Sequence, residues 1–319
     1  MATKALSGTR AGAAPVARRR LFRRRRHREA AFVWSLLLPA LAIFLLYRLI
    51  PLGWNFVLSF QFWEPTKPAE FAGLYHYQDM LFYDDVFWQA LENTFVYMTM
   101  APISIAIALI LALMVNSRIR GRGIYRTIIF LSYPLMAVAV GIIWRWLYDA
   151  KIGLFNYLLR ASGLIDQPIA FLESFSTAMP AVIAAAIWQI VGFFMIILLT
   201  GLQSIPPHLY EAAAIDGAPR WAQFWRITLP LLRPSIFLCF VIGIIASFTS
   251  FDLIYVMTNG GPGHATELLI TYIYKAAFKL TQFDYAGALT VVMFLLFVGI
   301  ALIGNVLAGG EAGKVDITE

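Results

Sequence analysis

The sequence predicts an all-α, polytopic membrane protein with six helices that cross the bilayer. Its 319 residues are 60% hydrophobic and only 13% charged, which is too apolar for a soluble domain of this length. Several apolar runs exceed the roughly 18–20 residues that a helix needs to span the hydrocarbon core. Inside that core every backbone N–H and C=O must be paired internally, so each run is expected to be helical.

The predicted spans follow one another along the chain, separated by more polar segments. Prolines such as Pro102 and Pro134 lie within them. Membrane helices tolerate proline because neighbouring helices satisfy the backbone groups that proline frees. The approximate cores of the six helices are Phe32–Ile50, Leu91–Val115, Tyr125–Tyr148, Met179–Leu202, Ile236–Met257 and Ala286–Ala308.

Charge is distributed unequally between the two sides of this arrangement. Most of the 25 Lys and Arg residues fall in the N-terminal tail and in the loops after the second and fourth helices. By the positive-inside rule, both termini and these loops are cytoplasmic. The chain then divides into a basic tail (1–30), a membrane domain (31–308) and a short polar tail (309–319). We expect the arginines of the first tail to set orientation and to lie against anionic lipid, and we predict no nucleic-acid partner.

The sequence lacks the motifs of an enzyme. No phosphate-binding loop and no Gly-x-Ser-x-Gly elbow occur, and the four histidines are scattered. The lone Cys239 cannot form an internal disulfide. We therefore predict no catalytic residue, no metal site and no cofactor on this chain.

The loop at about 204–234, between the fourth and fifth helices, predicts a short cytoplasmic helix. Proline suits the first turn of a helix, and Pro206-Pro207 precede a stretch rich in Ala, Leu and Glu that reaches Asp216. Gly217 fits the position after the helix, where the left-handed conformation is nearly free only for glycine. Pro219 prevents the same helix from continuing.

A second helix is predicted from Arg220 to Thr228. One face of it would carry three aromatic residues and a threonine: Trp221, Phe224, Trp225 and Thr228. In the first helix, three alanines keep the surface slim, and Glu211 and Asp216 give it negative charge. On these grounds alone the loop is either a docking element for a soluble partner or a plain surface connector.

The same loop carries a specific motif. Glu211-Ala212-Ala213 is followed by Asp216-Gly217 and then by Ile227-Thr228-Leu229-Pro230. This arrangement resembles the permease subunits of bacterial ABC importers, in the carbohydrate-uptake branch that includes the maltose-type and glycerol-phosphate-type permeases. Weaker matches, such as Gly201-Leu202-Gln203 and Thr258-Asn-Gly-Gly-Pro262, extend the resemblance from the first predicted helix to the last.

The resemblance implies a role and a set of partners. The chain would form half of a translocation pathway in the bacterial cytoplasmic (inner) membrane, beside a second, related permease. Two copies of a separate ATPase subunit would hold ATP and Mg, and an extracytoplasmic solute-binding protein would deliver the cargo. The helix between the fourth and fifth spans would be the coupling helix to the ATPase, through Glu211, Ala212, Ala213, Asp216 and Gly217. A sugar is the expected cargo, with a polyol or a glycerol phosphate as alternatives.

Polar residues inside apolar helices are candidates for the pathway itself. Such residues are costly in lipid, so they face a wet cavity or hydrogen-bond between helices. The candidates are Asn93, Gln189, Ser247, Ser250 and Asp252. The main rival hypothesis is an ion-coupled secondary transporter, which would usually carry buried acids and internal repeats. A receptor or scaffold would need a soluble domain, and the sequence shows none.

Overall fold

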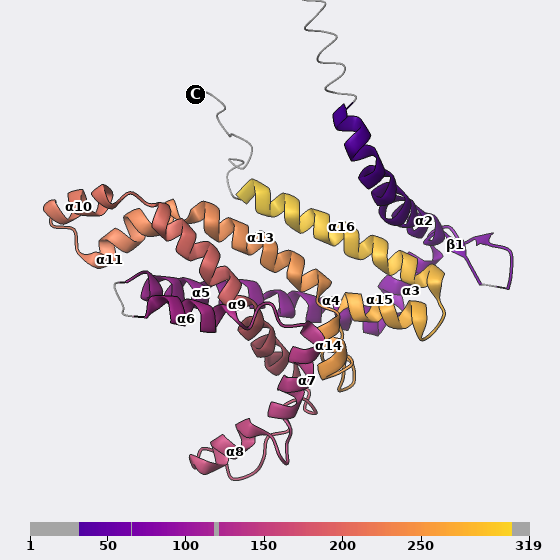
Figure 1. Cartoon of the computed structure of the whole chain (residues 1–319). Coiled ribbons are helices and arrows are strands. Elements are labelled where there is room, and N and C mark those ends of the chain that lie inside the picture. The colour runs from indigo at the N-terminus through magenta and orange to yellow at the C-terminus, as the bar shows by residue number, and fades with distance from the viewer. Residues whose placement is uncertain (1–31, 65, 118–120, 308–319) are drawn as a thin grey trace, which may run out of the picture. The chain divides into compact units, whose positions relative to one another are not determined.

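The computed structural model describes residues 32–64, 66–117 and 121–307 (Figure 1). The described residues fall into two compact units, divided between Val57 and Leu58, which are treated separately here. The predicted tails 1–30 and 309–319 lie outside the described residues.

The first unit contains the first predicted span. A helix runs over Phe32–Leu58, where it passes from the first unit into the second. It contains a π-helical turn, η1 (Leu45–Leu49), followed by α2 (Ile50–Leu58). Pro51 explains the turn, because proline has no N–H to donate and its ring clashes with the carbonyl four residues earlier. Most side chains of this helix are exposed and apolar, as a lipid-facing span requires.

The second unit is a helical bundle with one small hairpin. Strand β1 (Gln61–Phe62) pairs antiparallel with β2 (Glu70–Phe71), with Gln61 opposite Phe71. The helices that follow are α3 (Tyr75–Phe82), α4 (Asp85–Met98), α5 (Met100–Asn116), α6 (Arg122–Phe130), α7 (Ala137–Leu147), α8 (Leu154–Ala161), α9 (Ala178–Ser204), α10 (Pro207–Ile215), α11 (Arg220–Gln223), η2 (Phe224–Thr228), α12 (Leu229–Leu231), α13 (Arg233–Thr249), α14 (Asp252–Met257), α15 (Leu269–Phe278) and α16 (Phe283–Leu307).

Four helices in the described part of the chain are long and apolar enough to cross a membrane. They are Phe32–Leu58, Asp85–Asn116, Ala178–Ser204 and Phe283–Gly304, and they coincide with the first, second, fourth and sixth predicted spans. A fifth is counted if Arg220–Leu231 and Arg233–Thr249, which meet at 62°, form one bent span. The protein is therefore a mostly helical, multi-pass membrane protein.

The third predicted span differs from the expectation of one helix over 125–148. It is divided into α6 and α7 by a turn at residues 131–136. Pro134 explains the break, because proline disfavours helical geometry at the preceding residue, Tyr133. The Tyr133 ring then stacks on Phe193 of α9, with centroids 4.3 Å apart.

The fifth predicted span, expected over 236–257, is also divided. Helix α13 ends at Thr249, and α14 begins at Asp252. Ser250 leaves helical geometry with ψ of 77°, and its Oγ lies 2.7 Å from the hydroxyl of Tyr97 on α4. A hydrogen bond between the side chains of two helices thus lies at the point where α13 is interrupted.

Helix α9 occupies the centre of the bundle, with α5 as its main partner. Its buried side chains include Phe194, Met195 and Leu198, none of which is exposed to solvent. A second apolar cluster joins α3, α4, α15 and α16 around Met80, Phe87 and Leu289. The segments between the predicted spans contain the short helices α3, α8 and α15.

Candidate coupling loop and translocation pathway

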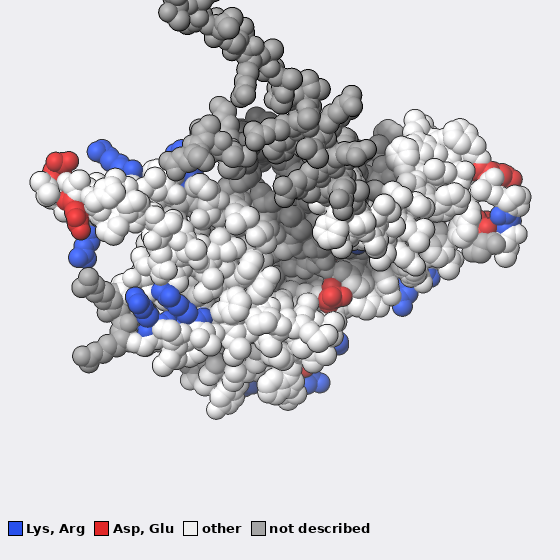
Figure 2. Space-filling model, turned by 45° about the horizontal axis from the view of Figure 1, so that its top comes forward, with Lys and Arg blue, Asp and Glu red and all other residues white. Residues whose placement is uncertain are grey.

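Helix α10 presents the predicted coupling motif at the surface. Pro207 occupies its first turn, as expected. Glu211, Ala212 and Asp216 are exposed, and Ala213 is half-buried. In Figure 2, acidic and basic side chains gather over the end of the unit that carries α10 and α11, while most of the same face is uncharged.

Gly217 ends this helix in the left-handed conformation, with φ of +78°. The N–H of Ala218 donates to the carbonyl of Ala213 at 2.9 Å, and the N–H of Gly217 donates to that of Ala214 at 3.1 Å. These bonds satisfy carbonyls that a helix end otherwise leaves free. No heavy atom lies within 4 Å of where a Cβ would stand, so the position demands glycine through its backbone alone.

Helix α10 is hydrogen-bonded to the segment that follows it. The hydroxyl of Tyr210 lies 3.0 Å from Thr228 Oγ1, and Gln223 Nε2 donates to the carbonyl of Ala218 at 2.9 Å. Tyr210 was not among the residues predicted from sequence. Its position immediately before Glu211 is the only signal that the sequence offers for it.

The predicted aromatic face of the second helix forms, but most of it remains open. Thr228 is buried and Phe224 is half-buried, whereas Trp221 is 71% exposed and Trp225 is 49% exposed. The three rings contact one another, with centroids 5.3–6.5 Å apart. Indole rings are typical of membrane–water interfaces, which is consistent with their exposure.

Three of the five pathway candidates line one cavity, here called the first cavity, with a volume of about 200 Å³. Gln189 comes from α9, and Ser250 and Asp252 come from the break between α13 and α14. Tyr97 and Tyr133, which sequence reasoning missed, line it as well.

The first cavity lies where two helices are interrupted. Gln189 Nε2 donates to the carbonyl of Leu135, at 3.0 Å, in the turn between α6 and α7. Ser250 and Tyr97 satisfy each other at the second break. Irregular backbone at membrane depth is tolerated where it is buried in protein or lines a water-filled cavity, and transporters place substrate sites at such interruptions.

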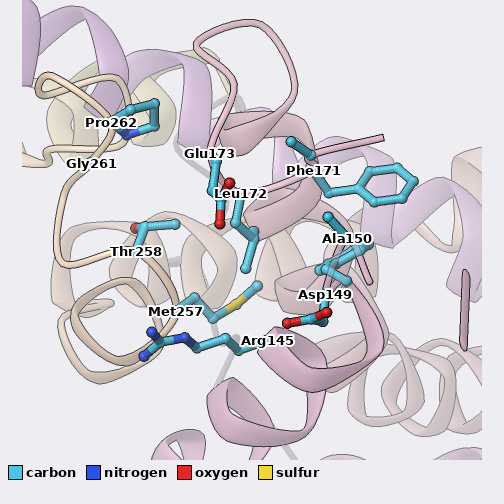
Figure 3. Close-up of a pocket in the computed structure, with 12 residues that line it drawn as sticks. Arg145, Asp149, Ala150, Phe171, Leu172, Glu173, Met257, Thr258, Gly261 and Pro262 are labelled. Carbon is cyan, nitrogen blue, oxygen red and sulfur yellow. The ribbon is translucent and has the colours of Figure 1, made fainter. Parts of the chain in front are cut away.

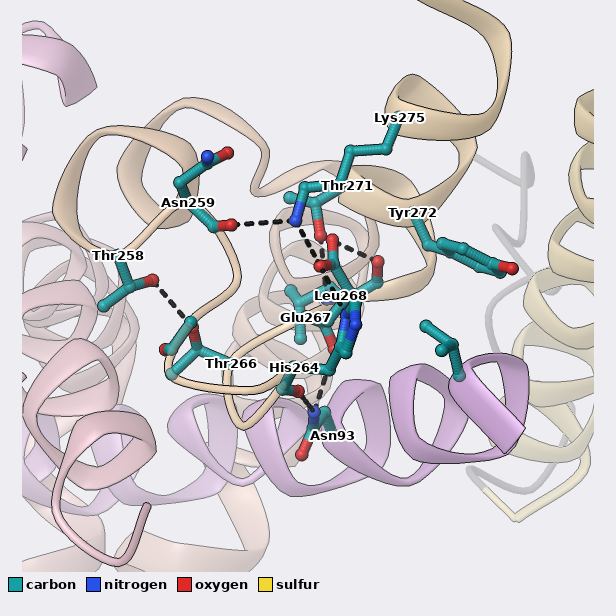
Figure 4. A network of polar contacts seen from close by, with 12 residues as sticks. Asn93, Thr258, Asn259, His264, Thr266, Glu267, Leu268, Thr271, Tyr272 and Lys275 are labelled. Carbon is teal, nitrogen blue, oxygen red and sulfur yellow. Dashed lines mark hydrogen bonds and ion pairs between the residues drawn. The ribbon is translucent and has the colours of Figure 1, made fainter. Parts of the chain in front are cut away.

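The other two candidates lie elsewhere. Ser247 is fully buried and donates to the carbonyl of Gly243, at 2.9 Å, in its own helix. Asn93 of α4 donates through Nδ2 to the carbonyls of His264 and Glu267, at 2.8 and 3.0 Å (Figure 4). It therefore holds the loop between α14 and α15.

That loop, residues 258–268, contains a polar network that sequence reasoning missed. The Glu267 side chain is fully buried, its Oε2 accepts from Lys275 Nζ, and His264 Nδ1 lies 3.3 Å away (Figure 4). Lys275 also donates to the carbonyl of Asn259 at 2.8 Å. A Cβ at Gly260, which has φ of +82°, would lie 2.3 Å from Glu267 Oε2. The glycine is thus required by both its backbone and its neighbour.

A second cavity, of about 370 Å³, lies against the same loop (Figure 3). Arg145, Asp149 and Glu173 line it together with Met257 and Pro262. The backbone N–H groups of Ile152 and Lys151 hold the pKa of Asp149 below its usual range, so this carboxylate stays ionised.

Helices α7 and α14 connect the two cavities. Ala137 and Leu253, near the start of each helix, line the first cavity, whereas Arg145 and Met257, near the end of each, line the second. The two helices pack against each other. A pair of short helices thus has a cavity at each end.

Comparison with known proteins decides the family. Residues 104–309 match the family described as the inner membrane component of binding-protein-dependent transport systems. The chain belongs to this family. It is thus a multi-pass permease of the ABC transporter class.

Individual relatives agree with this assignment over almost the whole chain. A probable ABC transporter permease of Pyrococcus horikoshii is 33% identical over 280 residues, which cover 87% of this chain and 96% of the relative. The trehalose/maltose transport system permease protein MalF of Thermococcus litoralis is 32% identical over 285 residues, covering 87% and 94%. A chain of a bacterial ABC transporter that imports the acidic polysaccharide alginate superposes with a TM-score of 0.77 at 26% identity, covering 94% of this chain and all of that one.

Proposed function

We propose that this chain is one membrane subunit of an ATP-driven importer for a sugar or a related solute such as a polyol or a glycerol phosphate. The observation that carries the proposal is the exposed helix α10, with Glu211 on its surface and left-handed Gly217 at its end, in a member of this permease family. The names of the relatives, which concern trehalose, maltose and alginate, support a carbohydrate.

The contacts of α10 support a role in coupling. In the proposed complex, α10 lies in a cleft of the ATPase, and Glu211 pairs with a basic residue there. Movement of α10 would be transmitted through Tyr210 and Thr228 to η2, and then through α12 to α13. At about 1.5 Å per residue, α13 carries that movement roughly 25 Å to Ser250 at the first cavity. The coupling is thus a rigid-body displacement of packed helices.

The proposed assembly contains two ATPase subunits with ATP and Mg, a second related permease and an extracytoplasmic binding protein. The permease chain carries no cofactor of its own, and ATP hydrolysis belongs to the separate subunit. We further propose six passes through the bacterial inner membrane with both termini cytoplasmic, in which α6–α7 and α13–α14 each cross as a broken pair.

The test is to purify the tagged protein from its native membranes in mild detergent and to identify its partners by mass spectrometry. The expected partners are an ATPase, a second permease and a binding protein. The purified complex is then placed in proteoliposomes and supplied with the binding protein loaded with candidate sugars. Uptake that requires ATP supports the proposal. Uptake driven by an imposed ion gradient without ATP contradicts it and favours a secondary transporter.

A further inference from the structure

A third cavity, of about 410 Å³, lies apart from the coupling loop and from the first two cavities. It is formed by α3, the start of α4, α15 and the start of α16. Part of its wall, residues 75–84, precedes the segment that matches the family. The residues that line it are Tyr75, His76, Asp79, Tyr83, Asp84, Tyr272, Gln282, Asp284 and Tyr285.

Two of the three carboxylates in this cavity have structural partners. Asp84 Oδ1 accepts from the N–H groups of Val86 and Phe87 at 2.9 and 3.0 Å, which caps α4. Its Oδ2 accepts from the hydroxyls of Tyr272, at 2.5 Å, and Tyr285. These four hydrogen bonds give the half-buried Asp84 a structural role.

Asp284, in the first turn of α16, is also engaged. Its Oδ2 accepts from the backbone N–H of Trp63 at 3.1 Å and lies 3.6 Å from His76 Nε2. His76 in turn donates to the carbonyl of Gln61 at 3.0 Å. A carboxylate in the first turn of a helix is also favoured by the helix dipole.

Asp79 has none of these partners. Within the described residues, no hydrogen bond or ion pair involves its carboxylate, which is half-buried and lines the cavity. It lies in the last turn of α3, where the helix dipole disfavours negative charge. The cavity also holds the carboxylates of Asp84 and Asp284. A bound cation would supply the partner that Asp79 lacks and would offset the unfavourable helix dipole.

The lining further restricts what kind of cation fits. No Lys or Arg lines the cavity, so three carboxylates face at most one imidazolium, that of His76. Among the residues that the structure describes, no group of three or more His, Cys, Asp or Glu side chains has the arrangement of a metal site. Four tyrosine rings surround the space instead, and aromatic faces attract organic cations.

We propose that this third cavity is a binding site for a small organic cation that carries an ammonium group. Asp79 supplies the free carboxylate, and the open rings of Tyr75 and Tyr83, 53% and 82% exposed, supply the aromatic surface. The site is separate from the sugar pathway proposed above and requires neither the ATPase nor transport. The volume of the cavity lies in the range of small-molecule sites.

The experiment measures binding to the full chain in lipid nanodiscs by isothermal titration calorimetry. Choline chloride is the probe, and glucose and sodium acetate are the neutral and anionic controls, all at constant ionic strength. Asp79→Asn is expected to weaken choline binding about tenfold or more, because it removes a charge-assisted contact. Asp85→Asn is the matched control: its side chain is exposed, adjacent to Asp84 in sequence and outside the cavity lining, so choline binding should be unchanged.

Thermal unfolding of each variant verifies that it is folded, and Tyr83→Ala provides a second, uncharged test of the same site. Weaker choline binding in Asp79→Asn and Tyr83→Ala, with Asp85→Asn unaffected, supports the proposal. Absence of saturable choline binding overturns it, as does equal displacement by sodium chloride. If choline does not bind but an external protein partner is lost on Asp79→Asn, the cavity receives a protein side chain and the proposal is wrong.

Discussion

Gly217 ends α10, and glycine is required there because the backbone is in the left-handed conformation. A β-branched residue in the left-handed region costs about 1–2 kcal/mol, which changes a population roughly five- to thirty-fold. A Cβ at this position meets no neighbour, so the substitution strains the backbone without a clash. We expect Gly217→Val to reduce ATP-dependent uptake in proteoliposomes by about tenfold while the protein still inserts into the membrane.

Gly163 provides the matched control. It ends α8 with φ of +72° and open space around it, and the bonds from Gly163 to Arg160 and from Leu164 to Leu159 repeat the pattern at Gly217. Gly163→Val should therefore carry the same strain and leave uptake near the wild-type rate. Equal loss of uptake in both variants would show that general instability, and not coupling, is measured.

A second prediction for a single residue concerns Asn93 and the stability of the folded protein. Its amide satisfies two carbonyls of the 258–268 loop. Asn93→Leu should cost about 1–3 kcal/mol, because two hydrogen bonds worth about 0.5–1.5 kcal/mol each are lost. The checks are the apparent Tm of the purified protein, which should fall by several degrees, and faster proteolytic cleavage within the loop. Gln203→Leu, at an exposed position, is the control, and an equal fall in its Tm would contradict the role of Asn93.

At the scale of the helix, the sequence predicts what depends on local pattern. Long apolar runs define α9 and α16, and the order of proline, alanine-rich helix and glycine defines α10 nearly to the residue. The breaks at residues 131–136 and at Ser250 were not predicted, although Pro134 is visible in the sequence. Proline alone does not have to break a membrane helix, because neighbouring helices can satisfy the freed backbone groups. The side chains that contact the two breaks, Gln189 at Leu135 and Tyr97 at Ser250, come from other helices, so the local sequence does not reveal them.

Dependence on contacts between helices also explains which residues of the candidate site the sequence did not predict. Gln189, Ser250 and Asp252 were selected because each is polar in an apolar segment, and the fold brings them to one cavity. Tyr97 and Tyr133 were not predicted as lining residues, because tyrosine is common at membrane boundaries and its presence there needs no binding site. Asn93 has the same sequence signal as Gln189 and yet lies in a different network, which only the tertiary contacts reveal.

We predict that the first cavity is accessible to water-soluble reagents. Cys239 is the one cysteine of the sequence, so a Cys239→Ser background leaves this chain without a native thiol. In that background, Asp252→Cys should react with a water-soluble methanethiosulfonate reagent in the assembled transporter, and a transported solute should slow the reaction. Only an ionised thiol reacts, and ionisation requires water.

Leu238→Cys is the control for this labelling. Leu238 lies on the same helix pair, on α13, and is 49% exposed at a position outside the cavity lining. In a membrane this exposed apolar side chain should face lipid, so its thiol should remain unreactive. Equal reaction at both positions, or protection by solute at neither, would count against the first cavity as part of the pathway.

At the scale of the whole molecule, the number of crossings depends on the broken helices. Four unbroken spans alone leave open whether the two interrupted segments traverse the bilayer or return to the same side. The distribution of charge favours traversal, because Arg122 and Arg226 fall on the side predicted to be cytoplasmic and the acidic segments on the other. The first cavity, at the two helix breaks, and the second cavity lie at opposite ends of the α7–α14 pair, as expected if these helices form the outer part of each crossing.

The six-pass arrangement is tested by single cysteines on either side of each broken pair. Arg122→Cys and Lys151→Cys flank α6–α7, and Arg226→Cys and Lys279→Cys flank α13–α14; all four positions are exposed. In the cysteine-free background, a membrane-impermeant maleimide applied to intact cells or spheroplasts should label positions 151 and 279. Positions 122 and 226 should react only after the membrane is opened, because they lie on the cytoplasmic side. If both members of one pair react from the same side, that segment is re-entrant, and the chain crosses the membrane fewer than six times.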